Sequence, residues 1–338
     1  MIRDIEKEKI MREIPIEQIE GFRIGNAQDA AGGSGCTVII CEGGAVAGVD
    51  IRGGSPATRE TALLSPVNAC QQIHGVLLSG GSAFGLDAAG GVMKYLEERG
   101  IGFDVGIGHV PIIPGACLYD LIAGDPTFRP DARMGYDACV DSERNIPQKG
   151  NFGAGTGATI GKFMGVDRLM KGGLGTYAVQ SGDLKVGAVV AVNCLGDVYD
   201  ADTGQQIAGL LTEDKRALDN TRRLMWKTVQ QDKNVFTGNT TIGCIVTNAQ
   251  LSKDQCNKLA SMSHDGYAAA IKPVHTSADG DTIFYLSSGD ITVNPDGLGD
   301  LSAYVMARAI NEGVRNAVSA YGFKALCDLE KEISKEKR

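Results

Sequence analysis

Glycine, spread between short apolar runs, is the feature that most restricts how this chain can fold. The sequence holds 46 glycines in 338 residues, and they are interleaved with the apolar runs instead of gathering in linkers. Glycine in such places is typical of tight turns and of backbone packed closely against backbone or ligand. We therefore expect buried strands joined by short turns.

Strand-like and helix-like patterns alternate from end to end. Strands are predicted at residues 36–41, 45–51, 75–78, 186–193, 241–247 and 282–286, the first two as a hairpin that turns at residues 42–44. Helices are predicted at residues 84–98, 211–232, 253–272 and 301–320, the third opened by a capping box of Ser252 and Gln255. This mixture, without a long linker or a fixed repeat, predicts one layered α/β domain over residues 1–338.

Composition excludes several classes of function. Hydrophobic content of 43% and a net charge of -8 are those of a globular protein without a nucleic-acid footprint. The charged start is not a signal peptide, and no run is long enough to span a membrane. Nine scattered cysteines without a C-x-x-C pair indicate reduced thiols in a cytoplasmic protein. The four histidines lack metal-ligand spacing, so neither a metal nor a cofactor is expected.

The sequence Gly238-Asn239-Thr240 joins a flexible pair to a β-branched run. A chain that cuts itself before Thr240 would leave a hydroxyl and a free α-amine on one residue. Such an amine, with a pKa of roughly 7.7–8.0, can act as a base for its own hydroxyl. The alternative is an ordinary loop that enters a buried strand.

Residues 153–162 form a glycine-rich run that ends in Lys162. The run breaks the phosphate-loop pattern, because Thr156 stands at the first glycine and Phe163 follows the lysine, and it also misses G-x-G-x-x-G. Nucleotide binding is therefore not expected. The run either delivers Lys162 to a crowded place or is a packing loop before a surface lysine. Ser82 lacks the G-x-S-x-G spacing of a hydrolase elbow and is predicted to cap a helix.

Further polar side chains lie at strand ends. Asp279 and Asp281, two apart before a strand, could converge on an amine or share a proton, or could belong to an Asx turn. Asn193 could donate to an oxyanion or form a turn. Tyr119 could lend its phenol to a site or pack with its hydroxyl paired.

Five segments, in order, resemble the DmpA or L-aminopeptidase/D-esterase family, which also contains β-aminopeptidases and nylon-oligomer endohydrolases. The matching segments are residues 44–54, 78–86, 153–157, 238–242 and 273–282. The ordered set is more specific than any one of its members.

This resemblance implies an N-terminal-nucleophile-like αββα sandwich whose precursor cuts itself into an α chain, residues 1–239, and a β chain, residues 240–338. It implies that Thr240 is the nucleophile and that the Asn239–Thr240 bond is cut. Asp279 and Asp281 become the acidic pair beside it. The family's nylon-oligomer branch supplies the roles of three further residues: Lys162, Asn193 and Tyr119.

The chain also departs from the aminopeptidase members, which often use a serine nucleophile and a tyrosine after the glycine-rich loop. Thr240 and Lys162 stand at those places, while Ser277 still lies two before an acid. We expect hydrolysis of short peptides or amino amides through an acyl-enzyme on Thr240. The alternatives are endo-hydrolysis of 6-aminohexanoate oligomers, acyl transfer of the ornithine acetyltransferase type, and a non-catalytic scaffold or nucleotide binder. The family implies a homotetramer of αβ units.

Overall fold

The computed structural model describes residues 10–230 and 238–336. Its main strands form one ten-stranded sheet, in the order β1-β11-β12-β15-β17-β3-β5-β8-β4, with β2 paired to β3 beside this path. These strands are β1 (Arg12–Ile14), β2 (Arg23–Asp29), β3 (Ser34–Ile51), β4 (Ala57–Arg59), β5 (Ile73–Ser79), β8 (Gly115–Cys117), β11 (Gly173–Ser181), β12 (Leu184–Val192), β15 (Ile242–Ala249) and β17 (Thr282–Ile291).

The long strand β3 connects two layers of this sheet. Its first half pairs with β2 and β5, and its second half pairs with β17. The hairpin predicted at residues 42–44 is therefore wrong. Both halves find their partners in other strands, and the register shifts where Gly44 takes a φ of +79°, so the chain continues as one strand.

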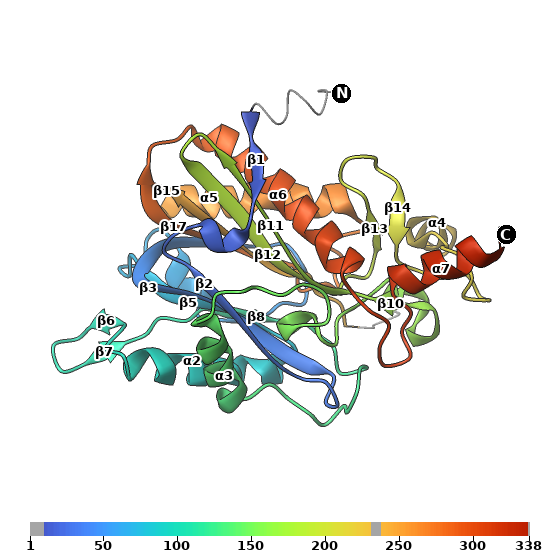
Figure 1. Cartoon of the computed structure of the whole chain (residues 1–338), viewed down its shortest axis with the longest axis horizontal. Coiled ribbons are helices and arrows are strands. Elements are labelled where there is room, and N and C mark those ends of the chain that lie inside the picture. Colours follow the sequence, from blue (N-terminus) through green and yellow to red (C-terminus); the bar gives the residue numbers. More distant parts are fainter. Residues whose placement is uncertain (1–9, 231–237, 337–338) are drawn as a thin grey trace.

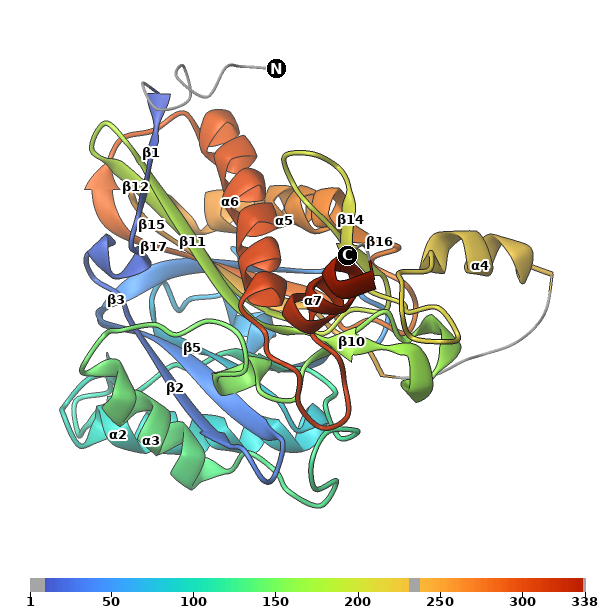
Figure 2. The same ribbon diagram turned by 45° about the vertical axis from the view of Figure 1, so that its right-hand side comes forward.

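Helices cover both outer faces, as Figures 1 and 2 show. Helices α2 (Ala88–Glu97) and α3 (Ala132–Ser142) lie on the layer of β2, β3 and β5, while α5 (Lys253–Ala270) and α6 (Pro295–Arg315) lie on the layer of β11, β12, β15 and β17. Shorter elements complete the fold: β6 (Phe103–Asp104), β7 (His109–Val110), β9 (Thr159–Ile160), β10 (Met170–Lys171), β13 (Asp197–Tyr199), β14 (Gln206–Ala208), β16 (Ile271–Lys272), α4 (Thr221–Lys227), α7 (Leu326–Glu336) and the 3-10 turns η1 (Ile16–Gln18), η2 (Thr61–Leu64), η3 (Ser82–Asp87), η4 (Gly153–Gly155), η5 (Lys162–Met164) and η6 (Val166–Arg168).

Three hydrophobic cores follow from the period-two pattern of the strands. In β15, Cys244 and Val246 point between the two sheet layers, while Ile245 points to α5 and α6. The third core lies between β3, β5 and the helices α2 and α3. Helix, sheet, sheet and helix are thus stacked as four layers, which confirms the predicted αββα sandwich.

Two of the helix predictions are confirmed, and two need correction. The capping box of Ser252 opens α5 as expected, and α6 covers most of residues 301–320 but begins earlier, at an Asn294 cap. Residues 84–98 divide into η3 and α2. The expected Ser82 cap is wrong, because Ser82 takes a φ of +56° inside η3 and Gly81 occupies the cap position without a side chain.

The helix predicted at residues 211–232 is wrong over most of its length. Leu211 instead pairs with Leu218 in a β-bridge, and Asn220 caps the short helix α4. Residues 231 and 232 lie outside the described residues.

The cysteines and the lengths of the helices bear on two predictions from composition. All nine cysteines are free and seven are buried, as expected of reduced thiols. Over residues 10–230 and 238–336, no helix is both long and apolar enough to cross a membrane.

Candidate active site

The predicted nucleophile lies at one edge of the central strands. Strand β15 runs antiparallel to β12 and parallel to β17. The end of β12 and the starts of β15 and β17 therefore meet at the same edge, which brings Asn193, Thr240 and Asp281 together. Thr240 is only 4% exposed, and its N–H donates to the Asn193 carbonyl at 3.1 Å.

Asn193 is fully buried and uses both ends of its side-chain amide. Its Oδ1 accepts from the Thr159 N–H at 2.9 Å and from Lys162 Nζ at 2.7 Å. Its Nδ2 donates to the Tyr119 carbonyl at 2.9 Å. The side chain thus connects its own loop to the segment of residues 159–162 and to the loop of Tyr119. It does more than form a turn, which was the alternative.

Lys162 is fully buried, so the alternative of a surface lysine is wrong. Gly161 before it takes a φ of +71°, and this turn directs the chain inward. Besides Asn193, Lys162 Nζ contacts the Gly238 carbonyl at 3.2 Å. Burial lowers the pKa of this amine from 10.5 to about 7, against the opposing charges of Asp279 and Asp120. A substantial fraction of the amine is therefore neutral near pH 7.

Tyr119 packs against the backbone just before the predicted cut. A Cβ on Gly238 would lie 2.5 Å from the ring Cγ of Tyr119, and Gly238 has a φ of +48°. Both the contact and the backbone angle require glycine here.

The acidic pair lies beside the residues that lead into β15: Asp279 forms a bridge with Asn239, and Asp281 bonds to Thr241. Asp281 Oδ1 accepts from the Thr241 N–H at 2.8 Å, and Oδ2 contacts the His275 ring Nδ1 at 2.8 Å. Asp279 Oδ2 accepts from the Thr276 hydroxyl at 2.6 Å, while the buried Oδ1 of Asp279 has no hydrogen-bond partner among the described residues. Burial, then the negative charge of Asp281, raises the pKa of Asp279.

The carbonyl group of Asn239 is held by donors. Its oxygen accepts from the Gly280 N–H at 3.0 Å and from the Thr240 hydroxyl. A Cβ on Gly280 would lie 2.7 Å from Thr240 Oγ1, so glycine leaves the room that the hydroxyl occupies. The Thr240 hydroxyl therefore lies beside the carbonyl group of the preceding residue, and the Gly280 N–H donates to the same oxygen as an oxyanion donor would.

The structure brings all but one of the predicted site residues together: Tyr119, Lys162, Asn193, Gly238, Asn239, Thr240, Asp279 and Asp281. Ser277 is exposed on the turn outside this cluster. Sequence reasoning missed His275, which lacked metal-ligand spacing, and the backbone donors of Thr159 and Gly280, which carry no side-chain signal.

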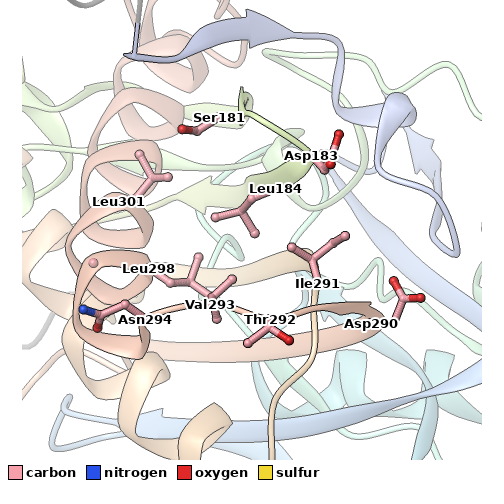
Figure 3. Close-up of a pocket in the computed structure, with 11 residues that line it drawn as sticks. Ser181, Asp183, Leu184, Asp290, Ile291, Thr292, Val293, Asn294, Leu298 and Leu301 are labelled. Atoms are coloured by element: carbon pink, nitrogen blue, oxygen red, sulfur yellow. The ribbon is translucent and has the colours of Figure 1, made fainter.

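An open groove lies elsewhere, between the β11–β12 turn and the start of α6 (Figure 3). Leu184, Ile291 and Leu298 line it, together with Asp183 and Asp290. These residues lie at the opposite ends of β12 and β17 from the Thr240 cluster, so the groove is separate from it.

The comparison that decides the family covers nearly the whole chain: the sequence model of Peptidase family S58 matches residues 15–326. This chain belongs to peptidase family S58. It is therefore a hydrolase that acts on peptide bonds, and the resemblance to DmpA-type enzymes is confirmed.

Proteins similar to this S58 peptidase are consistent with this family assignment. An uncharacterized aminopeptidase of Mycobacterium tuberculosis is 38% identical, with 93% of this chain and 97% of the relative covered. A 6-aminohexanoate-oligomer endohydrolase of Kocuria sp. is 29% identical, with 87% and 84% covered. The solved L-aminopeptidase D-Ala-esterase/amidase of Ochrobactrum anthropi, a variant of the Ntn hydrolase fold, matches with a TM-score of 0.71 at 18% identity, over 96% of this chain and 94% of that one. The last match supports the fold alone.

Proposed function

We propose that this S58 peptidase is a self-processing threonine hydrolase. Thr240 first cuts the Asn239–Thr240 bond and then, as the N-terminal residue of the new β chain, hydrolyses amide bonds of short peptides or amino amides. The observation that carries this proposal is the hydrogen bond from the Thr240 hydroxyl to the Asn239 carbonyl oxygen. The Gly280 N–H donates to the same oxygen.

Maturation proceeds in two steps. Thr240 Oγ1 attacks the Asn239 carbonyl carbon while its proton passes to a base, and Gly280 stabilises the oxyanion. The C–N bond then breaks, the nitrogen takes a proton, and an ester links Asn239 to Oγ1. Water hydrolyses this ester, leaving a carboxylate on Asn239 and a free amine on Thr240. Lys162, with a pKa of about 7, is suited to serve as the base.

Turnover repeats this chemistry on a substrate. Thr240 Oγ1 attacks the substrate carbonyl, with the new α-amine or Lys162 as base, and the amine product leaves before water releases the acyl group. Asp279, whose buried Oδ1 is available, orients the new ammonium group, and Asp281 holds the strand through Thr241. The second N–H of Asn193 Nδ2, beside the one on the Tyr119 carbonyl, is proposed to donate to the oxyanion, and such a donor is typically worth about 10²–10³ in rate.

The two proposed chains stay together after the cut. Strand β12 of the α chain pairs with β15 of the β chain, and β17 of the β chain pairs with β3 of the α chain. Residues 1–338 therefore remain one domain made of two chains.

The test compares wild type with two substitutions at the nucleophile. Thr240→Val keeps the shape but lacks the hydroxyl, whereas Thr240→Ser keeps a hydroxyl. On a denaturing gel, wild type and T240S should give two bands that sum to 35.5 kDa, and T240V should stay whole. Cleavage of T240V at the wild-type rate would refute the proposal.

Endo-hydrolysis of linear amide oligomers is the second candidate, favoured by the 29% identical endohydrolases and by Lys162 and Asn193, which resemble residues of the nylon-oligomer branch. A screen of amino-acid p-nitroanilides, β-amino amides and 6-aminohexanoate oligomers, each with free and acetylated amines, separates exo from endo action. Adding an amine acceptor shows whether the acyl group goes to water or to the amine, which tests acyl transfer.

A further inference from the structure

The turn that carries both acids of the site, residues 272–282, also holds His275 against Asp281. The backbone N–H and the ring Nδ1 of His275 both contact Asp281 Oδ2, at 3.1 Å and 2.8 Å. The other oxygen, Oδ1, accepts from the Thr241 N–H at 2.8 Å. Because two backbone N–H groups already donate to this carboxylate, we assign it as the acceptor of the ring contact too, with the proton on Nδ1.

The backbone of His275 takes a conformation that few residues with a Cβ adopt. Its φ is +58°, in the left-handed region. In this conformation a single residue directs both its N–H and its ring at one oxygen, Asp281 Oδ2. Residues held at such angles cluster at active sites, where the surrounding structure keeps them in place.

Two rings of helix α5 fix the orientation of the imidazole. His264 and Tyr267 are three residues apart and therefore lie on one face of the helix. The His275 ring meets His264 edge-on, with centroids 4.7 Å apart, and stacks on Tyr267 at 6.1 Å. Both rings of α5 are fully buried, and the His275 side chain is only 18% exposed. The imidazole is thus packed with its Nδ1 on Asp281.

The neighbouring His264 has different hydrogen-bond partners. Its Nε2 contacts the carbonyl of Asp50 in β3 at 3.1 Å, and its buried Nδ1 has no partner within residues 10–230 and 238–336. Of these two touching histidines, His275 is therefore the one that donates to an acid of the site.

We propose that His275 is a positioning residue of the Thr240 site: its ring N–H holds Asp281, which in turn holds the Thr241 N–H and so the nucleophile. This inference rests on the proposed function. Thr241 directly follows the nucleophile, so a shift of the carboxylate changes where Thr240 Oγ1 stands relative to the carbonyl that it attacks. A displacement of about 1 Å at a reacting group can cost about 10² in rate.

The test uses two substitutions that both accept a positive φ. His275→Asn places a side-chain N–H near the position of the ring Nδ1–H, whereas His275→Gly removes the donor. A hydrogen bond to a charged group is worth at least about tenfold in an equilibrium or a rate, so H275G should slow self-cleavage by about tenfold or more. H275N should stay within about threefold of wild type.

Turnover separates positioning from folding. On an amino-acid p-nitroanilide that wild type hydrolyses, mature H275G should lose kcat by about tenfold and keep KM within about threefold, because His275 acts through Asp281. Circular dichroism confirms that each variant is folded when its rates are measured. A kcat of H275G within twofold of wild type, or an H275N as slow as H275G, would overturn the inference.

His264→Gln is the matched control. The glutamine Nε2 can still donate to the Asp50 carbonyl, and His264 holds no acid of the site. Both rates of H264Q should therefore stay within about threefold of wild type, although the two histidine rings touch. A tenfold loss of kcat in H264Q beside an unchanged kcat in H275G would assign the role to the wrong histidine.

A measurement on the wild-type protein depends neither on activity nor on the folding of H275G. In protein with 15N-labelled histidine, the Nδ1–H of His275 should give a protected, downfield ring signal in the NMR spectrum. The signal is assigned by its absence from H275N and its presence in H264Q. A wild-type spectrum without a hydrogen-bonded Nδ1–H from His275 would also overturn the inference.

The two levels of failure are distinct. A wild-type protein that cuts itself and hydrolyses its substrate, with H275G equally fast, refutes only the role of His275. A wild-type protein that neither cuts itself nor hydrolyses any substrate of the screen refutes the proposed function, and the positioning role with it.

Discussion

This protein has two equally buried lysines, Lys162 and Lys171, which differ in their hydrogen-bond partners. Both are fully buried, and burial lowers the pKa of each from 10.5 to about 7. Lys171 Nζ donates to three backbone carbonyls, those of Gly155, Ala158 and Gly172, each at 2.9 Å. Lys162 Nζ donates to the Asn193 side chain and to the Gly238 carbonyl, which precedes the proposed cut.

The difference shows that burial and a lowered pKa do not by themselves identify a catalytic lysine. An ammonium group has three donors, and Lys171 places all three on the glycine-rich loop and its neighbour. Its task is to hold that loop in shape. Lys162 bonds with a residue proposed to stabilise the oxyanion and with the segment that the proposed reaction releases. In the proposed maturation Lys162 loses one of these partners, which suits a group that takes and gives protons.

The largest expected effect is on rate. Lys162→Met should lower the rates of self-cleavage and of substrate hydrolysis by about 10²–10⁴, the range of a general base, measured by gel time course and by p-nitroanilide assay. Its free energy of unfolding should stay nearer to that of wild type than the value of K171M does, because Asn193 Oδ1 keeps the Thr159 N–H and one carbonyl, that of Gly238, loses this donor. A K162M protein that cuts itself at the wild-type rate would exclude Lys162 as the base.

The matched substitution Lys171→Met should lower the free energy of unfolding. It leaves three buried carbonyls without their donor, and each loss costs about 1–3 kcal/mol, so the urea midpoint should fall clearly. Early unfolding of K162M together with wild-type unfolding of K171M would reverse the two assignments.

The pH dependence should separate stability from activity. Each lysine has a pKa of about 7 in the folded protein and an ordinary value of 10.5, so above pH 7 the unfolded chain binds more protons. The unfolding free energy should therefore rise with pH, by about 1.4 kcal/mol per unit for each lysine, and this contribution is lost as pH falls through 7. The buried thiols, with raised pKa values, act in the opposite direction above about pH 8.5, so the window is about pH 7 to 8.5.

Urea unfolding at several pH values checks this slope. Either lysine-to-methionine variant should lower it by the same amount. If Lys162 is the base, the self-cleavage rate of wild type should rise through pH 7 as its amine loses a proton. This rise should persist in K171M. Loss of the rise in K171M would show that the two amines titrate as one unit.

The smallest effect is expected at Ser277. Its side chain is exposed outside the cluster, so Ser277→Ala should change self-cleavage and hydrolysis by less than about twofold. Asp279→Asn, two residues later and buried, serves as the contrast and should lower turnover strongly. A large loss of activity in S277A would place the serine in the reaction.

The sequence predicted those parts of the fold that local pattern controls. Strands β12 and β15 and the capping box of α5 follow from apolar runs and from Ser252 and Gln255. The glycines at 43 and 44 predict a turn, whereas β3 runs on through them, because its partners come from distant strands that no local pattern reveals.

The predicted site residues could be grouped only through the resemblance, since spacing alone did not show that Lys162 and Asn193 meet. Lys171 had no sequence signal at all. Its partners are backbone carbonyls, which every residue has, and only the fold brings them to one point. The same holds for the Gly280 N–H on the Asn239 carbonyl.

Intact-mass spectrometry of the purified protein over time tests the central claim most directly. Self-processing by Thr240 requires the full-length mass to disappear as two masses appear, one for a chain that begins with an unmodified Thr240 and one for a chain that ends with the Asn239 carboxylate. Together they should exceed the precursor by one water. A full-length mass that persists, or fragments that begin at any other residue, would contradict the account.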